Sequence, residues 1–219
     1  SIVNTKQLTD EEIDRLTSIG ETISTLVCKS ELASLGYRVA TITNDELGIV
    51  TDSTFKNATI NKVEGKDILE KLKYVDIVFC PGFQGHSVHG KITTLGRGGS
   101  DLSAVAIGVA IDAREVEIYS DVNGIYTADP RLVPGAIKLD CISYVEMLEL
   151  AKNGAKVLNH RCVQLAASHN IAIHARSSFE DTKGTYVIGD DRIMKENLNQ
   201  LIISGITGSQ NEARITLVK

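Results

Sequence analysis

The segment TTLGRGGSD, residues 93–101, combines three glycines with a permanent cation and an acid. Glycines leave backbone N–H groups uncovered, so several of them can point toward one anion, and a helix that starts there adds its positive end. The guanidinium of Arg97 matches a carboxylate or a phosphate through two hydrogen bonds. The spacing fits neither GxGxxG nor GxxxxGK[ST]. The segment therefore predicts an anion site, with a simple tight turn as the alternative.

Asp101 ends this segment and needs a role of its own, because a carboxylate repels the anion that its neighbours attract. It could hold lysines in place, or orient the waters of a magnesium ion, since magnesium prefers oxygen ligands and often keeps its waters. The alternative is that Ser100 or Asp101 caps the following helix, which is compatible with the first role.

Two further segments carry charged groups. YSDVNGIYTADPR (119–131) holds two turns and two aspartates, but its spacing departs from the EF-hand pattern. Lys156 in NGAKVL (153–158) offers a cation, with a capping or surface lysine as the alternative. His86 and His89 lie three residues apart without an evident third ligand, so no residue is predicted to bind a metal directly.

Helices and strands must position these segments. Apolar spacing predicts a helix over 10–35 that stops at Gly36. Further helices are predicted over 66–73, 102–112, 143–152 and 156–169, and strands over 37–43, 76–83, 115–121 and 171–177. The alternation predicts an α/β fold: a three-layer αβα sandwich with a mostly parallel central sheet. Ligands of such sheets collect at the carboxyl ends of strands, where both polar loops lie.

Composition limits the classes of protein and partner. The chain has 219 residues, 42% of them hydrophobic and 23% charged, with a net charge of -5. These values indicate a globular chain for which nucleic acid is not an expected partner. No apolar run and no leader pattern suggests a membrane, so we expect a cytoplasmic protein. The four cysteines form no CxxC pair and are predicted to be buried thiols.

The character of the sequence changes after Ile188. GDDRIMKENLNQ (189–200) is predicted to be a charged linker, and LIISGITGSQNEARITLVK (201–219) two strands joined by a turn. Two strands alone are marginally stable. We therefore predict one domain over 1–188, and the start of a second one over 189–219.

Together with PGFQG (81–85), these motifs resemble the aspartate kinase branch of the amino-acid kinase superfamily, from about Ser18 to Val187. The resemblance implies the fold of that family and the ATP-dependent phosphorylation of L-aspartate to 4-phospho-L-aspartate, the first step toward lysine, threonine and methionine. The alternatives are another kinase of the superfamily, acting on acetylglutamate, carbamate or UMP, and a nucleotide-binding or regulatory fragment without turnover.

The resemblance also implies the roles of individual residues, with ATP and Mg²⁺ as the cofactors. The implied substrate-binding residues are Glu21, Arg97, Gly98, Gly99 and Ser100. The implied ATP-binding residues are Ser120, Asp121, Tyr126, Thr127, Ala128, Asp129, Pro130, Arg131 and Lys156. Lys156 would reach the phosphates and Asp101 would organise the cations, so both are implied to be catalytic. Without the resemblance, Glu21 would be a solvated helix residue.

The two ends of the chain depart from the family pattern. The family begins with a strand and a KFGGTS-like loop, whereas this chain begins with SIVNTKQLTDEE, so the kinase domain is expected to be incomplete. The final segment, 203–219, resembles the opening of an α+β ACT regulatory domain. The resemblance implies an end-product amino acid as effector of the intact protein, and a homo-oligomer. Two milder departures from the family pattern lie inside the chain: Asn123, where the family often has Asp, and Leu102, where a small polar residue is common.

Overall fold

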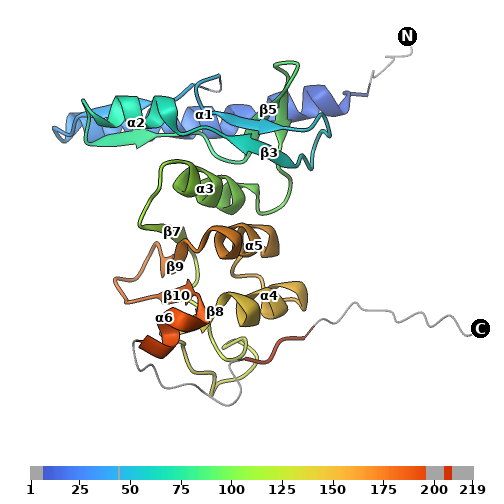
Figure 1. The fold of residues 1–219 in the computed structure, drawn as a ribbon, viewed down its shortest axis with the longest axis vertical. Helices are drawn as coiled ribbons and strands as arrows, with labels where there is room; N and C mark the ends of the chain where they lie inside the picture. Colours follow the sequence, from blue (N-terminus) through green and yellow to red (C-terminus); the bar gives the residue numbers. More distant parts are fainter. Residues whose placement is uncertain (1–6, 44, 196–204, 209–219) are drawn as a thin grey trace, which may run out of the picture. The chain divides into compact units, whose positions relative to one another are not determined.

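The computed structural model describes residues 7–43, 45–195 and 205–208. The chain divides into two compact units, Ser1–Val116 and Glu117–Lys219. Both units combine helices with strands, as Figure 1 shows. The predicted α/β class is confirmed.

The described residues of the first unit form three helices and six strands. The helices are α1 (Asp10–Ser34), α2 (Lys66–Leu72) and α3 (Gly99–Ala110). The strands are β1 (Val39–Thr41), β2 (Ile49–Thr51), β3 (Ile60–Val63), β4 (Ile77–Phe79), β5 (Gln84–Ser87) and β6 (Ile92–Thr94). β1 and β4 form a parallel pair, and the other four form a sheet in the order β3-β2-β5-β6. In that sheet β2 and β5 are parallel and the outer pairs are antiparallel.

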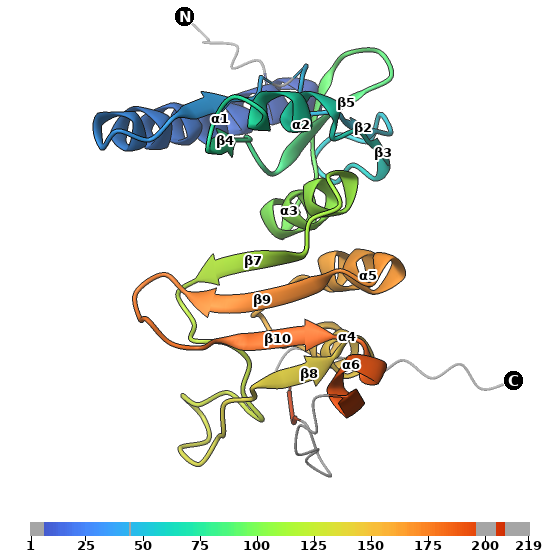
Figure 2. The same cartoon turned by 60° about the vertical axis from the view of Figure 1, so that its left-hand side comes forward.

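The second unit contains a four-stranded sheet in the order β7-β9-β10-β8, with its strands side by side in Figure 2. Its strands are β7 (Glu115–Ser120), β8 (Cys141–Ser143), β9 (Ala172–Ser177) and β10 (Thr185–Ile188). Its helices are α4 (Tyr144–Lys152), α5 (His160–His169) and α6 (Asp190–Lys195). β8 and β10 are parallel, whereas β9 and β10 are antiparallel, so this sheet is mixed as well.

Helix α1 begins and ends where the sequence predicts. Thr9 and Glu12 form a capping box, in which each side chain accepts the backbone N–H of the other residue. Gly36 follows the helix with φ of 90°, a conformation that glycine adopts without steric cost.

The two faces of α1 are the reverse of what its apolar spacing suggests. Leu16, Ile19 and Ile23 are 49–57% exposed. The buried residues of the helix are Asp14 and Ser18, at 0% and 2% exposure. Because they lie four residues apart, they share one side of the helix, and Glu21 continues that side as a half-buried residue. We call Asp14, Ser18 and Glu21 the polar stripe of α1.

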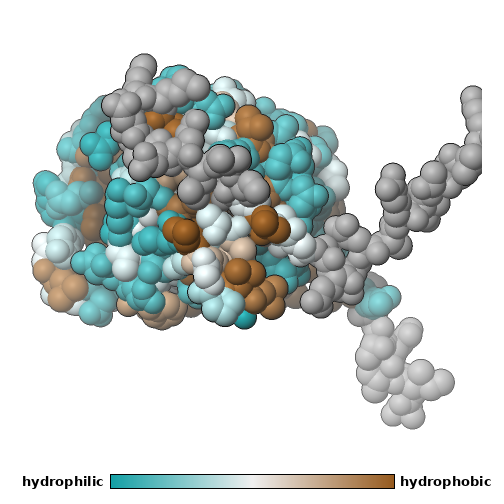
Figure 3. Space-filling model, turned by 90° about the horizontal axis from the view of Figure 1, so that it is seen from below, coloured by the Kyte–Doolittle hydropathy of each residue, from teal (hydrophilic) through white to brown (hydrophobic). Residues whose placement is uncertain are grey.

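Each unit has an apolar core of its own. In the first unit Ile42, Leu47, Ile49 and Ile68 are buried together. In the second unit Ile193 of α6 packs with Ala172 and Ile188. No helix in the described part of the chain is both long and apolar enough to cross a membrane. The face drawn in Figure 3 shows separate hydrophobic residues among hydrophilic ones, as is usual for a protein surface.

The prediction of four buried thiols is wrong, because Cys28 is exposed and Cys80 and Cys141 are half-buried, and only Cys162 is buried. Three further sequence-based predictions need correction. The predicted cap of α3 at Ser100 or Asp101 is wrong. Gly98 occupies the N-cap position, so the helix begins without a side-chain cap. Helix α5 begins at His160 and not at 156, because the side chain of Asn159 accepts the N–H of Arg161 and caps the helix there.

The third correction concerns the predicted linker over 189–200. Helix α6 fills its first part and contributes to the core of the second unit. The remainder of that segment and the strand–turn–strand predicted over 201–219 lie outside the described residues, apart from 205–208.

Candidate functional site

The glycine-rich turn joins β6 to α3. Gly96 and Gly98 have φ of +74° and +72°, and they flank the exposed Arg97. A Cβ atom at Gly96 would lie 2.8 Å from the backbone oxygen of Lys56 and 2.8 Å from Oδ1 of Asn57. Position 96 therefore requires glycine for two reasons: its backbone is left-handed, and there is no space for a Cβ atom.

The PGFQG turn packs against this glycine-rich turn. The N–H of Phe83 donates to Oγ of Ser103 at 3.0 Å, and its carbonyl accepts the N–H of Leu95 at 2.9 Å. Phe83 has φ of +67°, which is strained for an aromatic residue, and such strain gathers at functional sites. A Cβ atom at Gly99 would lie 2.9 Å from Cδ2 of Phe83. The structure thus brings two separate sequence motifs together.

The first turn of α3 contains Gly99, Ser100 and Asp101. The backbone N–H groups of a first helical turn point along the helix axis, and the helix dipole makes this end positive. Ser100 is exposed and Asp101 is half-buried. The turn therefore combines backbone N–H groups, a hydroxyl and the Arg97 cation, with one carboxylate beside them.

Glu21 lies on the helix that contacts β6. Asp14, two turns earlier on α1, accepts hydrogen bonds from the backbone N–H and the hydroxyl of Thr94, both at 2.8 Å. Thr94 is the last residue of β6, three residues before Arg97. The structure thus places Glu21 and Arg97 in one unit, on two segments joined by a buried carboxylate. Sequence reasoning missed Asp14; the available signal was its spacing from Ser18 and Glu21.

In the second unit, β7 leads into the loop with most of the predicted ATP-binding residues. The side chain of Asp129 accepts three hydrogen bonds from Arg131: 2.9 Å from its backbone N, 3.0 Å from Nε and 2.8 Å from Nη2. These bonds lower the pKa of Asp129, and the charge of Lys156 lowers it further. The pKa of Arg131 is raised by Asp129 first and also by Asp121. Four predicted residues thus share one electrostatic neighbourhood.

The buried Thr185 of β10 anchors the start of this loop. Its hydroxyl accepts the N–H of Ile125 at 2.9 Å and donates to the carbonyl of Leu139 at 2.6 Å. Gly124, with φ of +104°, lies so close that a Cβ atom there would be 2.6 Å from this hydroxyl oxygen. The two ends of the loop are therefore held together at a single side chain.

Further bonds shape the middle of the loop. Tyr126 forms a β-bridge with Lys138, and Thr127 exchanges two hydrogen bonds with Ile137, at 2.9 Å and 3.0 Å. Ser120, at the end of β7, accepts the N–H of Val122. Tyr126, Thr127, Ala128 and Asp129 are half-buried, while Asp121, Pro130 and Arg131 are exposed.

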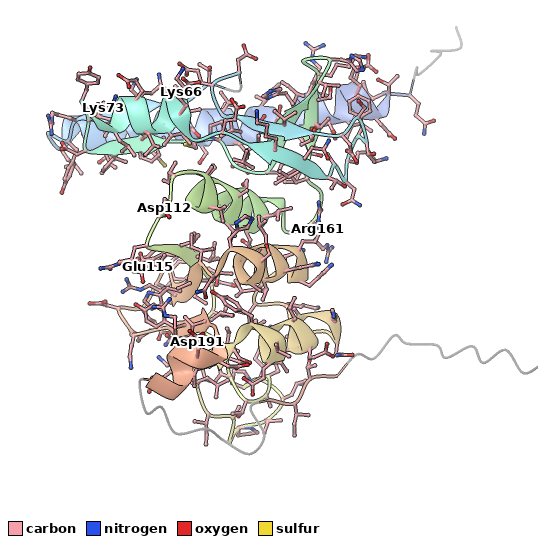
Figure 4. All side chains as sticks on the ribbon, viewed as in Figure 1. Lys66, Lys73, Asp112, Glu115, Arg161 and Asp191 are labelled. Carbon is pink, nitrogen blue, oxygen red and sulfur yellow. The ribbon has the colours of Figure 1, made fainter. Side chains whose placement is uncertain are left out.

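Lys156 lies in the turn between α4 and α5 and is exposed. Gly154 gives this turn its shape, with φ of +113°. Arg161 lies at the start of α5, where Figure 4 labels it. Residues 205–208 contact both parts of this site: the N–H of Ile206 donates to the carbonyl of Thr127 at 2.7 Å, and Thr207 donates to the carbonyl of Asn153. The sequence had not indicated that contact.

The residues present fit a magnesium ion bound together with a nucleotide. Magnesium takes oxygen ligands, keeps several of its waters and uses one or two carboxylates besides the substrate phosphates. Asp121 is an exposed carboxylate beside Arg131, and the half-buried Asp101 stands in the first turn of α3. Each of these carboxylates offers oxygen atoms that can bind magnesium or accept hydrogen bonds from its waters.

Known proteins share this sequence and this fold. The profile of the amino acid kinase family matches residues 3–177. An aspartokinase of Helicobacter pylori is 44% identical over 206 residues, which are 94% of this chain and 51% of that protein. The chain thus spans about half the length of the curated relatives it matches.

Solved structures give the same result. Escherichia coli aspartokinase III in complex with aspartate and ADP has a TM-score of 0.74 and 31% identity, over 83% of this chain and 41% of that one. The same enzyme in complex with lysine and aspartate has a TM-score of 0.71, also at 31% identity and with the same coverage of both chains. The resemblance deduced from the motifs is confirmed. Because the family profile covers well over half of its residues, the chain belongs to the amino acid kinase family.

Proposed function

We propose that the protein transfers the γ-phosphoryl group of ATP to the side-chain carboxylate of L-aspartate, giving 4-phospho-L-aspartate. This reaction is the first step toward lysine, threonine and methionine. The observation that carries the proposal is the β6–α3 turn, in which Arg97 lies between two left-handed glycines directly before the N-terminus of α3. The names of the matched relatives and the aspartate and ADP of the E. coli complex support it.

The acceptor site of the proposal is in the first unit. Arg97 pairs with one carboxylate of aspartate, and the N–H groups of Gly98 and Ser100 add neutral donors. Gly99 lies between them in the proposed site, but its own N–H donates to the carbonyl of Gly96 at 2.9 Å. Glu21 receives the ammonium group. An amino acid is a zwitterion and needs both signs of charge, whereas UMP has no ammonium group for Glu21. The pairing of a cation with an acid therefore favours an amino acid.

The nucleotide site of the proposal is in the second unit. The loop from Ser120 to Arg131 surrounds the base, ribose and phosphates, and Lys156 reaches the phosphates. Within this loop the three hydrogen bonds from Arg131 to Asp129 favour one geometry of the turn. An aromatic ring at Tyr126 and the exposed Pro130 offer apolar surface to the base and ribose.

The mechanism follows from the charges. Two anions, a carboxylate and a triphosphate, must approach in line, so catalysis consists mainly of positioning and charge neutralisation. The attacking carboxylate of aspartate is ionised at neutral pH, so no general base is needed. Lys156 and the N–H groups at the start of α3 stabilise the negative charge that spreads in the transition state. Magnesium, when bound, would neutralise phosphate charge, and Asp101 would orient its waters.

Regulation by an end product is part of the proposal. The E. coli enzyme has been solved with lysine and aspartate, and lysine or threonine is the expected effector here. The ACT domain, the homo-oligomer and the cytoplasmic location remain predictions of the sequence.

A coupled assay of ADP release by the full-length protein tests the proposal. Aspartate, acetylglutamate, carbamate and UMP are offered in turn with ATP and Mg²⁺, and turnover is expected with aspartate. Turnover with UMP but not with aspartate would overturn the assignment. Titration calorimetry with ATP and aspartate provides a second test, because binding of both without turnover would instead identify a regulatory protein.

A further inference from the structure

Asp14 is a buried carboxylate that connects three segments of the first unit. It lies in the second turn of α1 and is 0% exposed. Its oxygens accept the N–H of Thr94 at 2.8 Å, the hydroxyl of Thr94 at 2.8 Å and the N–H of Lys56 at 2.9 Å. One side chain of α1 thus holds the end of β6 and the loop between β2 and β3.

The bonding of Asp14 differs from that of a surface ion pair. Its donors are two backbone N–H groups and one hydroxyl, while the ammonium group of Lys56 pairs with Asp10 at 2.9 Å. A buried carboxylate is costly unless its hydrogen bonds are made, and bonds to a charged acceptor are short and directional. Apolar packing would hold α1 against the sheet equally well. A carboxylate adds a fixed position of the helix along the strand, because each oxygen must meet its own donors.

The two ends of this connection carry the groups assigned to the acceptor. Thr94 is followed by Leu95, the glycine at 96 and then Arg97. The backbone of Lys56, whose N–H Asp14 holds, is also the wall against which Gly96 packs. On the other side, Glu21 lies seven residues after Asp14, on the same side of the helix. A shift of α1 along β6 would therefore change the separation of Glu21 and Arg97.

We propose that Asp14 is a positioning residue of the acceptor site: its bonds to Thr94 and Lys56 fix the position of α1, and with it Glu21, relative to the turn that carries Arg97. This inference rests on the proposed function. It assigns Asp14 no contact with the substrate. Binding groups must be placed within a fraction of an ångström, which a supporting shell of bonds provides.

Steady-state kinetics of two variants of the full-length protein test the proposal. In Asp14→Asn, an NH₂ group replaces one acceptor and faces a backbone N–H. In Thr94→Val the hydroxyl is lost and the shape is kept. Both should raise the KM for aspartate by about 10-fold or more, while the KM for ATP stays within about two-fold. Thr94→Ser keeps the hydroxyl and should restore the KM for aspartate.

Asp10→Asn is the matched control. Asp10 lies on the same helix and contacts the same lysine, but at the surface, with both side chains more than half exposed. Such pairs contribute little, so this variant should have wild-type constants for both substrates. If Asp14→Asn and Thr94→Val lower the melting temperature but leave the KM for aspartate unchanged, or raise both KM values equally, Asp14 only stabilises the fold and the proposal is wrong.

Wild-type turnover separates this proposal from the assignment of the substrate. If the wild-type protein does not phosphorylate aspartate but uses one of the other acceptors, the proposed substrate is wrong. The variants are then measured with the acceptor that is used, and a selective rise in its KM is still expected. If Asp14→Asn does not fold, the comparison of Thr94→Val with Thr94→Ser decides the question alone.

Discussion

Arg97 and Lys156 are both exposed cations, yet they lie in different units and are assigned to different substrates. Arg97 is held in a turn whose glycines fix the backbone on both sides, so its charge has a defined origin. Lys156 lies in the turn between α4 and α5, and its positive charge contributes to the lowered pKa of Asp129. The effects of removing each charge should therefore differ in kind.

Arg97→Ala should weaken aspartate binding far more than ATP binding, by about 2 kcal/mol or roughly 30-fold in Kd if the bound aspartate buries the pair, because its carboxylate then loses its partner. The affinity for ATP should remain unchanged. Calorimetric titration with each ligand measures both. Arg114→Ala is the control, since Arg114 is 91% exposed and contacts only its neighbour Glu115 among the described ion pairs. Equal losses for both ligands would contradict the role given to Arg97.

Lys156→Ala should lower kcat by about 100-fold with a modest effect on the KM for aspartate, because a cation aimed at the phosphates acts mainly on the transition state. Lys152→Ala, at the exposed end of α4, should behave as the wild type. Initial rates over a matrix of both substrates measure these constants. An unchanged kcat would make Lys156 an ordinary surface residue.

Among single residues, the sequence pointed to side chains in an unusual local sequence and missed those in a common one. Arg97 was predicted because three glycines surround it, and the structure places it at a helix N-terminus as expected. Glu21 needed the family resemblance, because an acid on a helix is common. Asp14 was missed because its spacing from Ser18 and Glu21 indicates only a shared helix face, whereas its partner Thr94 lies 80 residues away. The three hydrogen bonds from Arg131 to Asp129 were missed for a related reason, because they depend on the conformation of the turn and not on the spacing of residues in the sequence.

The β6–α3 turn, as an element, can be tested without any substrate. Gly96→Ala should lower the free energy of unfolding by about 1 to 3 kcal/mol, because a Cβ atom there strains a left-handed backbone and meets Lys56 and Asn57. Gly20→Ala is the opposite case: Gly20 is inside α1 with no atom within 4 Å of the added Cβ. That substitution should stabilise the protein by about 0.5 to 1 kcal/mol. Urea unfolding compares the two, and equal effects would show that the turn is not constrained as described.

Long elements were easier to predict than short ones. Helix α1 matched because a helical period over 25 residues and a terminal glycine agree. Strands β2, β3, β5 and β6 are three or four residues long and were missed; β5 is simply Gln-Gly-His-Ser. Pairing with neighbouring strands makes such segments extended, whatever their own preference. The start of α5 was misplaced because Asn159 caps it, a signal that the apolar spacing obscured.

At the scale of the whole molecule, the proposal divides the two substrates between the two units. Hydrogen exchange followed by mass spectrometry tests this division, because bound backbone N–H groups exchange more slowly. Aspartate should slow exchange over 96–101, and ATP with Mg²⁺ over 120–131 and 153–156. Each ligand alone should leave the other set at its free rate. Protection of 96–101 by ATP alone would place the nucleotide at the turn assigned to the acceptor.

The reversed faces of α1 change how tolerant this helix should be to mutation. A screen that ranked its positions by hydrophobicity would protect Leu16, Ile19 and Ile23. These residues are about half exposed among the described residues, so their replacement by polar residues should alter the folding stability of this chain little. The same screen would discard Asp14 and Ser18 as ordinary polar positions, although they are the ones enclosed by the protein. In laboratory evolution of this unit, we therefore expect substitutions to accumulate at Leu16, Ile19 and Ile23, and Asp14 and Ser18 to be retained.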